Sequence, residues 1–405
     1  MAIACPDCGT LQQLPRLRRG DVATCGCCDA RLERVWARSI NASLACALAT
    51  LILLFPANLA TLLEMRVAGT TIDIRLGSGV LALFANGWIL LPLLVAATAV
   101  LLPFLRYGLM VAALAAVRLS AGVHWRGAAF RWSILLDRWS MPEVFLIAVA
   151  IGYARVEAQA SIVYVGTGGY CLLAAAALAM LSRALLDRRT VWRALGAETH
   201  LAGGTPALSC TVCDLVQPVQ CEGRPCPRCG LTLRRRLPGV RKRTLALVIA
   251  AVLLYIPANL FPMNVTHYPG HDVTYRIVDG VMALFGAGLW PLGIMVSCTS
   301  VGIPLAKIMG LGWCLLSIHR HSDRHLKLKT KLFRLIDESG RWSNVDPFII
   351  AVIVPLMHLR NLVVTDAGGA ATAFIAVVVL TMAASRSFDP RLMWDAALER
   401  GPDGR

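Results

Sequence analysis

The dominant pattern along the chain is a series of long apolar stretches separated by short polar segments. About 20 apolar residues are needed to cross roughly 30 Å of hydrocarbon as an α-helix. Several stretches reach that length, which predicts eight transmembrane helices and an all-α polytopic membrane protein. The second and sixth stretches contain internal prolines, which predict kinks. The stretches lie near residues 41–63, 87–118, 142–163, 166–184, 244–264, 287–318, 345–364 and 368–385.

Composition and charge narrow the class of protein. Of 405 residues, 57% are hydrophobic and only 16% are charged, and the mean hydropathy is +0.63. Soluble domains carry about 25% charged residues, so this composition excludes a soluble enzyme and a disordered scaffold. The net charge of +16 could suggest nucleic acid, but 33 of the 40 Lys and Arg residues lie in the two termini, the central segment and two alternate loops. That distribution places the termini and the centre in the cytoplasm of a membrane protein, with no nucleic acid required.

An internal repeat organises the chain. Each copy has a cysteine-rich head followed by four apolar stretches, and four is even, so both copies have the same orientation in the membrane. The expected domains are a head at 1–38, a membrane domain at 39–190, a head at 205–238, a membrane domain at 239–390 and a cytoplasmic tail at 391–405. Four motifs recur at offsets of 201 to 203 residues: Phe55-Pro-Ala-Asn58 and Ile256-Pro-Ala-Asn259, Gly79–Phe84 and Gly280–Phe285, Pro103-x2-Arg106 and Pro304-x2-Lys307, and Arg138-Trp-Ser-x2-Glu143-x-Phe145 and Arg341-Trp-Ser-x2-Asp346-x-Phe348.

Each head contains two Cys-x2-Cys pairs, which predicts one structural zinc ion per head. Two such pairs supply four thiolates for a closed tetrahedral site, with no position left for a substrate. Redox-active dithiols are the alternative, but a cytoplasmic location disfavours disulfides. Cys27 and Cys221 lie outside these pairs, and their role is open. The predicted ligands are Cys5, Cys8, Cys25 and Cys28 in the first head, and Cys210, Cys213, Cys226 and Cys229 in the second.

Ionisable residues inside the apolar stretches are candidates for function, because a charge at membrane depth is costly unless it is paired or hydrated. Lys307 and its repeat counterpart Arg106 are cations within long stretches. Asp346 and Glu143 are acids at the cytoplasmic entrances of the stretches that follow. A cation and an acid are therefore expected to meet in each half. The alternative is that these charges snorkel to the headgroups or cap helices.

The second half adds hydroxyl groups around its charges. Ser300 precedes Lys307 by seven residues and shares its helix face, and Ala99 stands at the corresponding position of the first half. Ser343 and Asp346 share a second face, and Thr381 could complete a polar cluster. Such a cluster could bind an anionic headgroup or relay a proton, with Asp346 and Lys307 exchanging partners during a transport cycle.

Taken together, the repeated motifs and paired cysteine heads resemble the paraquat-inducible protein A (PqiA) family, including its lipophilic envelope-spanning tunnel A (LetA) branch. The resemblance extends from Cys5 to about Trp394. It implies two cytoplasmic zinc ribbons and two four-helix, tetraspanin-like membrane domains in the bacterial inner membrane. It also implies a non-enzymatic role in lipid transport, loading or unloading phospholipid at the base of a periplasmic tunnel formed by an MCE-domain partner.

The same resemblance implies a polar network for transport. By motif position it falls on Ser300, Lys307, Ser343, Asp346 and Thr381, with Glu143 as the acid of the first domain and Arg106 as a weaker candidate. Two other classes of function stay open from the sequence: a redox- or stress-responsive sensor that acts through its zinc thiolates, and a structural anchor for the tunnel protein.

Overall fold

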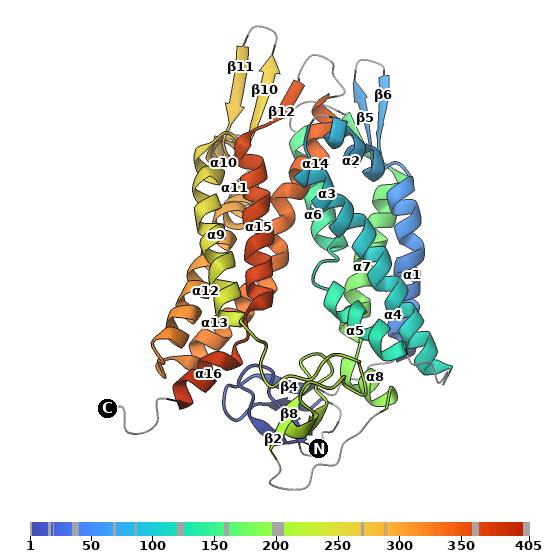
Figure 1. Cartoon of the computed structure of the whole chain (residues 1–405). Helices are drawn as coiled ribbons and strands as arrows, with labels where there is room; N and C mark the ends of the chain where they lie inside the picture. The colour runs from blue at the N-terminus through green and yellow to red at the C-terminus, as the bar shows by residue number, and fades with distance from the viewer. Residues whose placement is uncertain are drawn as a thin grey trace.

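The computed structural model describes residues 2–14, 18, 20–34, 40–67, 70–85, 87–119, 125–157, 162–196, 206–268, 271–286, 288, 290–358 and 364–399. The protein is mostly helical, and the helices form two bodies that stand side by side (Figure 1). We call residues 40–196 the first half and residues 240–399 the second half. The two cysteine-rich heads, ribbon 1 (residues 2–34) and ribbon 2 (residues 206–238), lie together at one end, and short β-strands project from the other end.

The two halves repeat the same order of elements. The first half contains α1 (Ile40–Leu59), β5 (Leu63–Val67), β6 (Thr70–Ile74), α2 (Leu76–Ala85), α3 (Leu90–Val95), a π-helical turn η1 (Ala96–Leu101), α4 (Leu102–Arg118), α5 (Arg126–Leu136), α6 (Pro142–Glu157), β7 (Ile162–Val165), α7 (Thr167–Leu185) and α8 (Arg188–Ala194). The second half contains α9 (Val240–Leu260), β10 (Asn264–Tyr268), β11 (His271–Tyr275), α10 (Ile277–Gly286), α11 (Trp290–Ser297), a π-helical turn η3 (Cys298–Gly302), α12 (Ile303–His319), α13 (Leu326–Ser339), a 3-10 turn η4 (Gly340–Asn344), α14 (Val345–His358), β12 (Val364–Ala367), α15 (Gly369–Ser387) and α16 (Arg391–Leu398).

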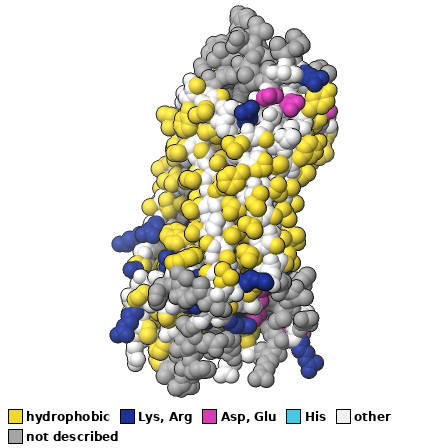
Figure 2. Space-filling view, turned by 90° about the vertical axis from the view of Figure 1, so that its right-hand side faces the viewer, with side chains coloured by type: hydrophobic (Ala, Val, Ile, Leu, Met, Phe, Trp, Pro, Cys, Tyr) yellow, Lys and Arg dark blue, Asp and Glu magenta, His cyan; other side chains and the backbone are white. Residues whose placement is uncertain are grey.

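Six helical segments of the described chain are long and apolar enough to cross a membrane, which makes this a multi-pass membrane protein. Two more of the predicted crossings coincide with α6 and α14, which have 16 and 14 residues and fall short of that length. Large apolar side chains face outward along the body, so that a hydrophobic surface covers the middle of the molecule and the charges gather toward its ends (Figure 2). Such a surface matches the hydrocarbon core of a bilayer. The six segments are Ile40–Leu59, Leu90–Arg118, Thr167–Leu185, Val240–Leu260, Trp290–His319 and Gly369–Ser387.

Two small β-sheets were not predicted from the sequence, so the all-α expectation is incomplete. In the first half β5 pairs with β6 and β7, and in the second half β10 pairs with β11 and β12, all antiparallel. Strands of four or five residues are too short to give a clear pattern beside helices of 20 residues. Four of them begin only at the last one or two residues of an apolar stretch.

The seam between the halves is formed by α6 and α14. Phe145 on α6 and Phe348 on α14 hold corresponding positions in the two repeats, and their rings meet edge to face with centroids 5.4 Å apart. Both side chains are buried. Corresponding residues of the two repeats therefore meet across the seam.

Candidate functional site: two cysteine clusters and two buried polar centres

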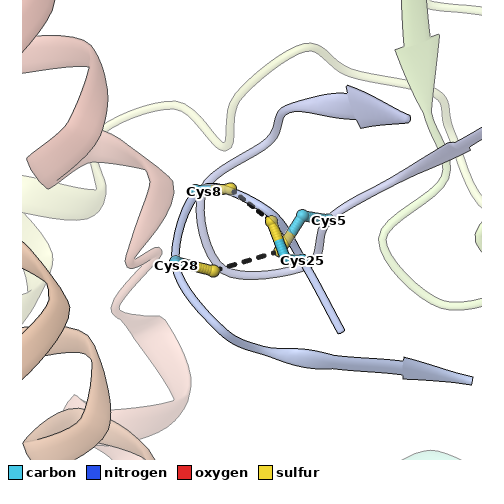
Figure 3. Close-up of side chains that lie close together, drawn as sticks. All are labelled: Cys5, Cys8, Cys25 and Cys28. Atoms are coloured by element: carbon cyan, nitrogen blue, oxygen red, sulfur yellow. Dashed lines mark hydrogen bonds between the residues drawn. The ribbon is translucent and has the colours of Figure 1, made fainter. Parts of the chain in front are cut away.

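Each ribbon brings its four predicted cysteines together. Ribbon 1 is made of two hairpins, β1 (Ala2–Ala4) with β2 (Leu11–Gln13) and β3 (Val22–Thr24) with β4 (Arg31–Arg34). Ribbon 2 has one hairpin, β8 (Ala207–Ser209) with β9 (Val216–Pro218), followed by a 3-10 turn, η2 (Val219–Cys221), and an isolated bridge. In each ribbon the four sulfur atoms lie within 4.8 Å of one another and are buried. Figure 3 shows the side chains of ribbon 1 converging from the two turns.

The four turns that carry the cysteines share one backbone conformation. In ribbon 1 the N–H of Gly9 donates to the carbonyl of Cys5 at 2.9 Å, and the N–H of Asp29 donates to that of Cys25 at 3.0 Å. Asp214 and Gly230 make the same bond in ribbon 2. All four of these residues have φ between 56° and 77°, a region that favours Gly and tolerates Asp. The turns thereby point both sulfurs of a pair into the cluster.

The clusters fit a tetrahedral zinc ion. Four sulfurs bonded to zinc at about 2.3 Å lie about 3.8 Å apart in a tetrahedron. The measured separations are 3.5 Å for Cys5–Cys28 and 3.6 Å for Cys8–Cys25, and 3.5 Å for both measured pairs of ribbon 2. A hydrogen bond with the Cys5 thiol lowers the pKa of Cys8 to about 4, against the effect of burial. This lowering favours the thiolate, which is the form that binds metal.

Neither supernumerary cysteine is among the four members of a cluster. Cys27 is half-buried, and its backbone N–H donates to Cys25 Sγ at 3.4 Å. Cys221 is half-buried at the end of η2. Their positions assign them no ligand role.

The first half contains a buried network of charges, the first polar centre (Arg106, Asp137, Glu143 and Arg183). Asp137 follows α5 directly, and its carboxylate lies 2.6 Å from Arg106 of α4 and 3.1 Å from Arg183 of α7. Arg183 also donates two hydrogen bonds, of 2.7 and 2.9 Å, to Glu143 at the start of α6. Burial opposes ionisation of Asp137, but the neighbouring arginines outweigh it and lower the pKa of its carboxyl. The network is internally neutralised.

The expected pairing of Arg106 with Glu143 is therefore wrong. Arg106 meets Asp137, and Glu143 meets Arg183 and, at 3.4 Å, Arg341 of the second half. Asp137, Arg183 and Arg341 were not predicted as members. The packing of α7 against α6 brings in Arg183, and the contact between the halves brings in Arg341. Those contacts join segments far apart in the chain, so local spacing carried no signal for them.

The second half has a different centre at the corresponding place, the second polar centre (Lys307, Gly340 and Ser343). Lys307 has 0% exposure, and its Nζ donates to Ser343 Oγ at 2.9 Å and to the carbonyl of Gly340 at 3.3 Å. Within the described part of the chain Lys307 makes no ion pair. Gly340 occupies the position that Asp137 holds in the first repeat, as the offset of 203 residues shows. The second half therefore has a glycine where the first half has the carboxylate that neutralises its cation.

The hydroxyl groups of the other two predicted residues bond within their own helical segments. Ser300, in the π-helical turn η3, donates to the carbonyl of Val296 at 2.6 Å, and Thr381 of α15 donates to that of Val378 at 3.0 Å. Asp346 is buried in the first turn of α14. The structure thus brings Lys307 to Ser343, while the hydroxyls of Ser300 and Thr381 are satisfied by their own helices.

Comparison with known proteins gives one family and several curated relatives. The family described as Paraquat-inducible protein A matches residues 40–196 and again residues 241–397. The chain is 29% identical to "Intermembrane transport protein PqiA" of Escherichia coli K12, over 97% of this chain and 95% of the relative. It is 27% identical to "Lipophilic envelope-spanning tunnel protein A" of the same organism, over 97% and 91%. A "Probable intermembrane transport protein" of Haemophilus influenzae is 24% identical over 97% and 95%. No solved structure matches the chain significantly.

Proposed function

Because this chain belongs to the paraquat-inducible protein A family, we propose that it is an inner-membrane subunit of an envelope lipid-transport system. In this role it loads or unloads phospholipid at the base of a periplasmic tunnel made by an MCE-domain partner. The transport names of its relatives support this role. The observation that carries the proposal is the buried Lys307, whose ammonium has hydroxyl and carbonyl partners where its repeat counterpart has a carboxylate.

The unneutralised Lys307 fits recognition of an anionic headgroup. A buried cation whose direct hydrogen-bond partners are neutral attracts a phosphate strongly, because the surroundings screen it weakly.

Proton coupling is a refinement of this mechanism. Ser343 lies in η4 and Asp346 lies three residues later in the first turn of α14, so a small shift of Lys307 could exchange one partner for the other. In the proposed cycle Lys307 contacts Ser343 in one state and Asp346 in the other. A proton carried by Lys307 or by Asp346 would then couple to the movement of lipid.

Four crossings in each half complete the proposed topology. The strand after α6 pairs in the same sheet with the strand after α1, so α1 and α6 deliver the chain to the same end. In the second half α14 and α9 do the same through β12 and β10. We therefore assign α6 and α14 as short crossings. The basic ribbon end, with both termini, faces the cytoplasm, and the sheets face the periplasm and the MCE-domain partner.

Zinc is the proposed metal in both ribbons, held by the eight cysteines of the two clusters. It would fix the fold of each ribbon and would have no open coordination position for a substrate. Together the two ribbons form the proposed cytoplasmic end of the molecule.

The test of this function is retention of phospholipid by the purified chain, measured by native mass spectrometry. Lys307→Ala should abolish retention, and Ser343→Ala should reduce it. Ser140→Ala, at the repeat counterpart of Ser343, is the matched control and should retain lipid. If Lys307→Ala and Asp346→Asn both retained lipid and supported full transport in cells, the proposal would be rejected, and an anchoring role for the partner would replace it.

A further inference from the structure

Two arginines at corresponding positions of the repeats each touch the last cysteine of a cluster, but the clusters are exchanged. Arg131 of α5, in the first half, donates to the carbonyl of Cys229 in ribbon 2 at 2.9 Å. Arg334 of α13, in the second half, lies 3.8 Å from Cys28 Sγ in ribbon 1. Each ribbon thus contacts the half that does not follow it in the sequence. Helices of the second half pass beside ribbon 1 in Figure 3.

Ribbon 1 binds the second half through both charges and apolar contacts. Arg334 forms an ion pair of 2.6 Å with Asp7, and Lys327 forms one of 3.2 Å with Asp29. From α16, Trp394 packs on the apolar core of ribbon 1 and donates to Thr330 of α13 at 3.2 Å. Ribbon 1 is therefore attached to both α13 and α16.

Ribbon 2 binds the first half more closely still. Its cysteines share an apolar core with Phe130 of α5 and Trp192 of α8. Gly127 of α5 approaches the ribbon so closely that a Cβ there would lie 2.0 Å from the carbonyl oxygen of Arg228. Ribbon 1 also reaches the first half, since its Glu33 pairs with Arg189 and Arg193 of α8 at 3.0 and 2.8 Å. Ribbon 2 likewise reaches the second half, since its Arg236 pairs with Asp395 of α16 at 2.6 Å. Each ribbon therefore contacts both halves, and the exchange concerns the helices α5 and α13.

The helices that receive the ribbons lead directly to the polar centres. α5 ends at Leu136, next to Asp137, which pairs with Arg106. α13 ends at Ser339, next to Gly340, whose carbonyl accepts a hydrogen bond from Lys307. α13 also packs tightly on the helix that carries Lys307, because Ile336 fills the space over Gly310 of α12.

We propose that the two ribbons are exchanged between the repeats, and that each one positions the cytoplasmic helix on which the polar centre of its host half rests. Ribbon 1 positions α13 and the second polar centre, and ribbon 2 positions α5 and the first. Arg334 and Arg131 are the positioning residues. A cluster of four thiolates with Zn²⁺ carries a charge of −2, which the cations of α13 favour. The consequence for lipid rests on the proposed function, whereas the exchange itself does not.

Hydrogen–deuterium exchange of the full-length protein in lipid nanodiscs tests the proposal without any transport assay. The double variant Cys25→Ser/Cys28→Ser, which removes two ligands of ribbon 1, should raise uptake in α13 and α16 and leave α5 unchanged. The matched variant Cys226→Ser/Cys229→Ser should raise uptake in α5 and leave α13 unchanged. An increase confined to the half that follows the altered ribbon in sequence, or no increase in either half, would overturn the exchange.

A second variant keeps both metal clusters intact. Arg334→Glu should raise uptake in α13 at an unchanged metal content of two ions per chain, and the charge-swapped double variant Asp7→Arg/Arg334→Glu should restore protection. Unchanged protection of α13 in the single variant would exclude Arg334 as a positioning residue. Because neither experiment measures lipid binding or transport, a chain that failed to retain phospholipid would still show the exchanged pattern, so the two proposals fail separately.

Discussion

The Arg106 guanidinium lies 2.6 Å from the Asp137 carboxylate, and the corresponding pair of the second repeat is Lys307 with Gly340. One half of a duplicated membrane protein therefore has a neutralised cation where the other has an unneutralised one. Removing one partner of a buried ion pair leaves an uncompensated charge and destabilises the protein, whereas a buried charge without a counter-charge marks a place where something else binds or moves. This difference separates a structural centre from a proposed transport centre.

Restoring the missing carboxylate should inactivate the second centre. A Cβ at Gly340 would lie 3.7 Å from Lys307 Nζ, an ordinary contact, so Gly340→Asp places an acid beside the cation without a clash. We expect loss of phospholipid retention and of transport at an unchanged or higher melting temperature. Gly340→Ala is the control and should behave as the native chain. If Gly340→Asp transported lipid as well as the native chain, a carboxylate beside Lys307 would be compatible with transport and this prediction would be wrong.

Removing the carboxylate of the first centre should instead destabilise the protein. Asp137→Asn leaves the buried Arg106 and Arg183 without their shared partner, at a cost of about 3 to 5 kcal/mol in the free energy of unfolding. Arg188 also pairs with Asp137, but its side chain is 52% exposed, so Arg188→Gln should cost less than about 1 kcal/mol. Denaturant unfolding in a constant detergent measures both. Equal effects of the two variants would contradict a buried structural role.

The pH dependence of this pair has a definite sign. The pKa of the Asp137 carboxyl is lowered in the folded protein. Its ion pairs therefore contribute to the free energy of unfolding at pH values above the unfolded pKa, about 3.9. This contribution is lost as the pH falls through the lowered value. Between pH 5 and 8, therefore, the stability difference between the native chain and Asp137→Asn should stay constant. A difference that vanished near pH 6 would show that the carboxylate titrates there.

Two metal ions per chain are expected in elemental analysis of the purified protein. Cys25→Ser/Cys28→Ser should reduce the count to one, and adding Cys226→Ser/Cys229→Ser should reduce it to zero. Cys27→Ser and Cys221→Ser are matched controls that should leave two ions, because neither residue is among the four sulfurs of a cluster. Loss of an ion in either control would assign that cysteine a ligand role.

The orientation can be tested with a thiol reagent that does not cross membranes. Thr71 and Thr274 are exposed on the sheets, and Asp323 is exposed at the ribbon end. Cysteines introduced at Thr71 and Thr274 should be labelled in cells with a permeable outer membrane, and one at Asp323 should be labelled only after lysis. The native chain gives the background labelling. The reverse pattern would invert the topology.

The local sequence determined the features whose physics is local or periodic. Apolar stretches of helical length predicted the six long helices, because burial in hydrocarbon requires about 20 apolar residues in succession. The Cys-x2-Cys spacing predicted both clusters, because a tight turn between two cysteines places both sulfurs on one side. The repeated motifs predicted the duplication and pointed to Lys307, Ser343 and Asp346, although the sequence did not show which of them touch.

Tertiary packing decided everything that joins distant parts of the chain. It paired Arg106 with Asp137 and brought Arg183 and Arg341 to Glu143, contacts set by how whole helices pack. It also closed three-stranded sheets from strands that are too short to recognise alone. Above all, it placed each ribbon against α5 or α13 of the repeat that does not follow it, where Arg131 meets ribbon 2 and Arg334 meets ribbon 1. The order of domains along the chain limits such contacts only through the length of the linkers. The complementarity of the surfaces therefore determines which helix each ribbon contacts.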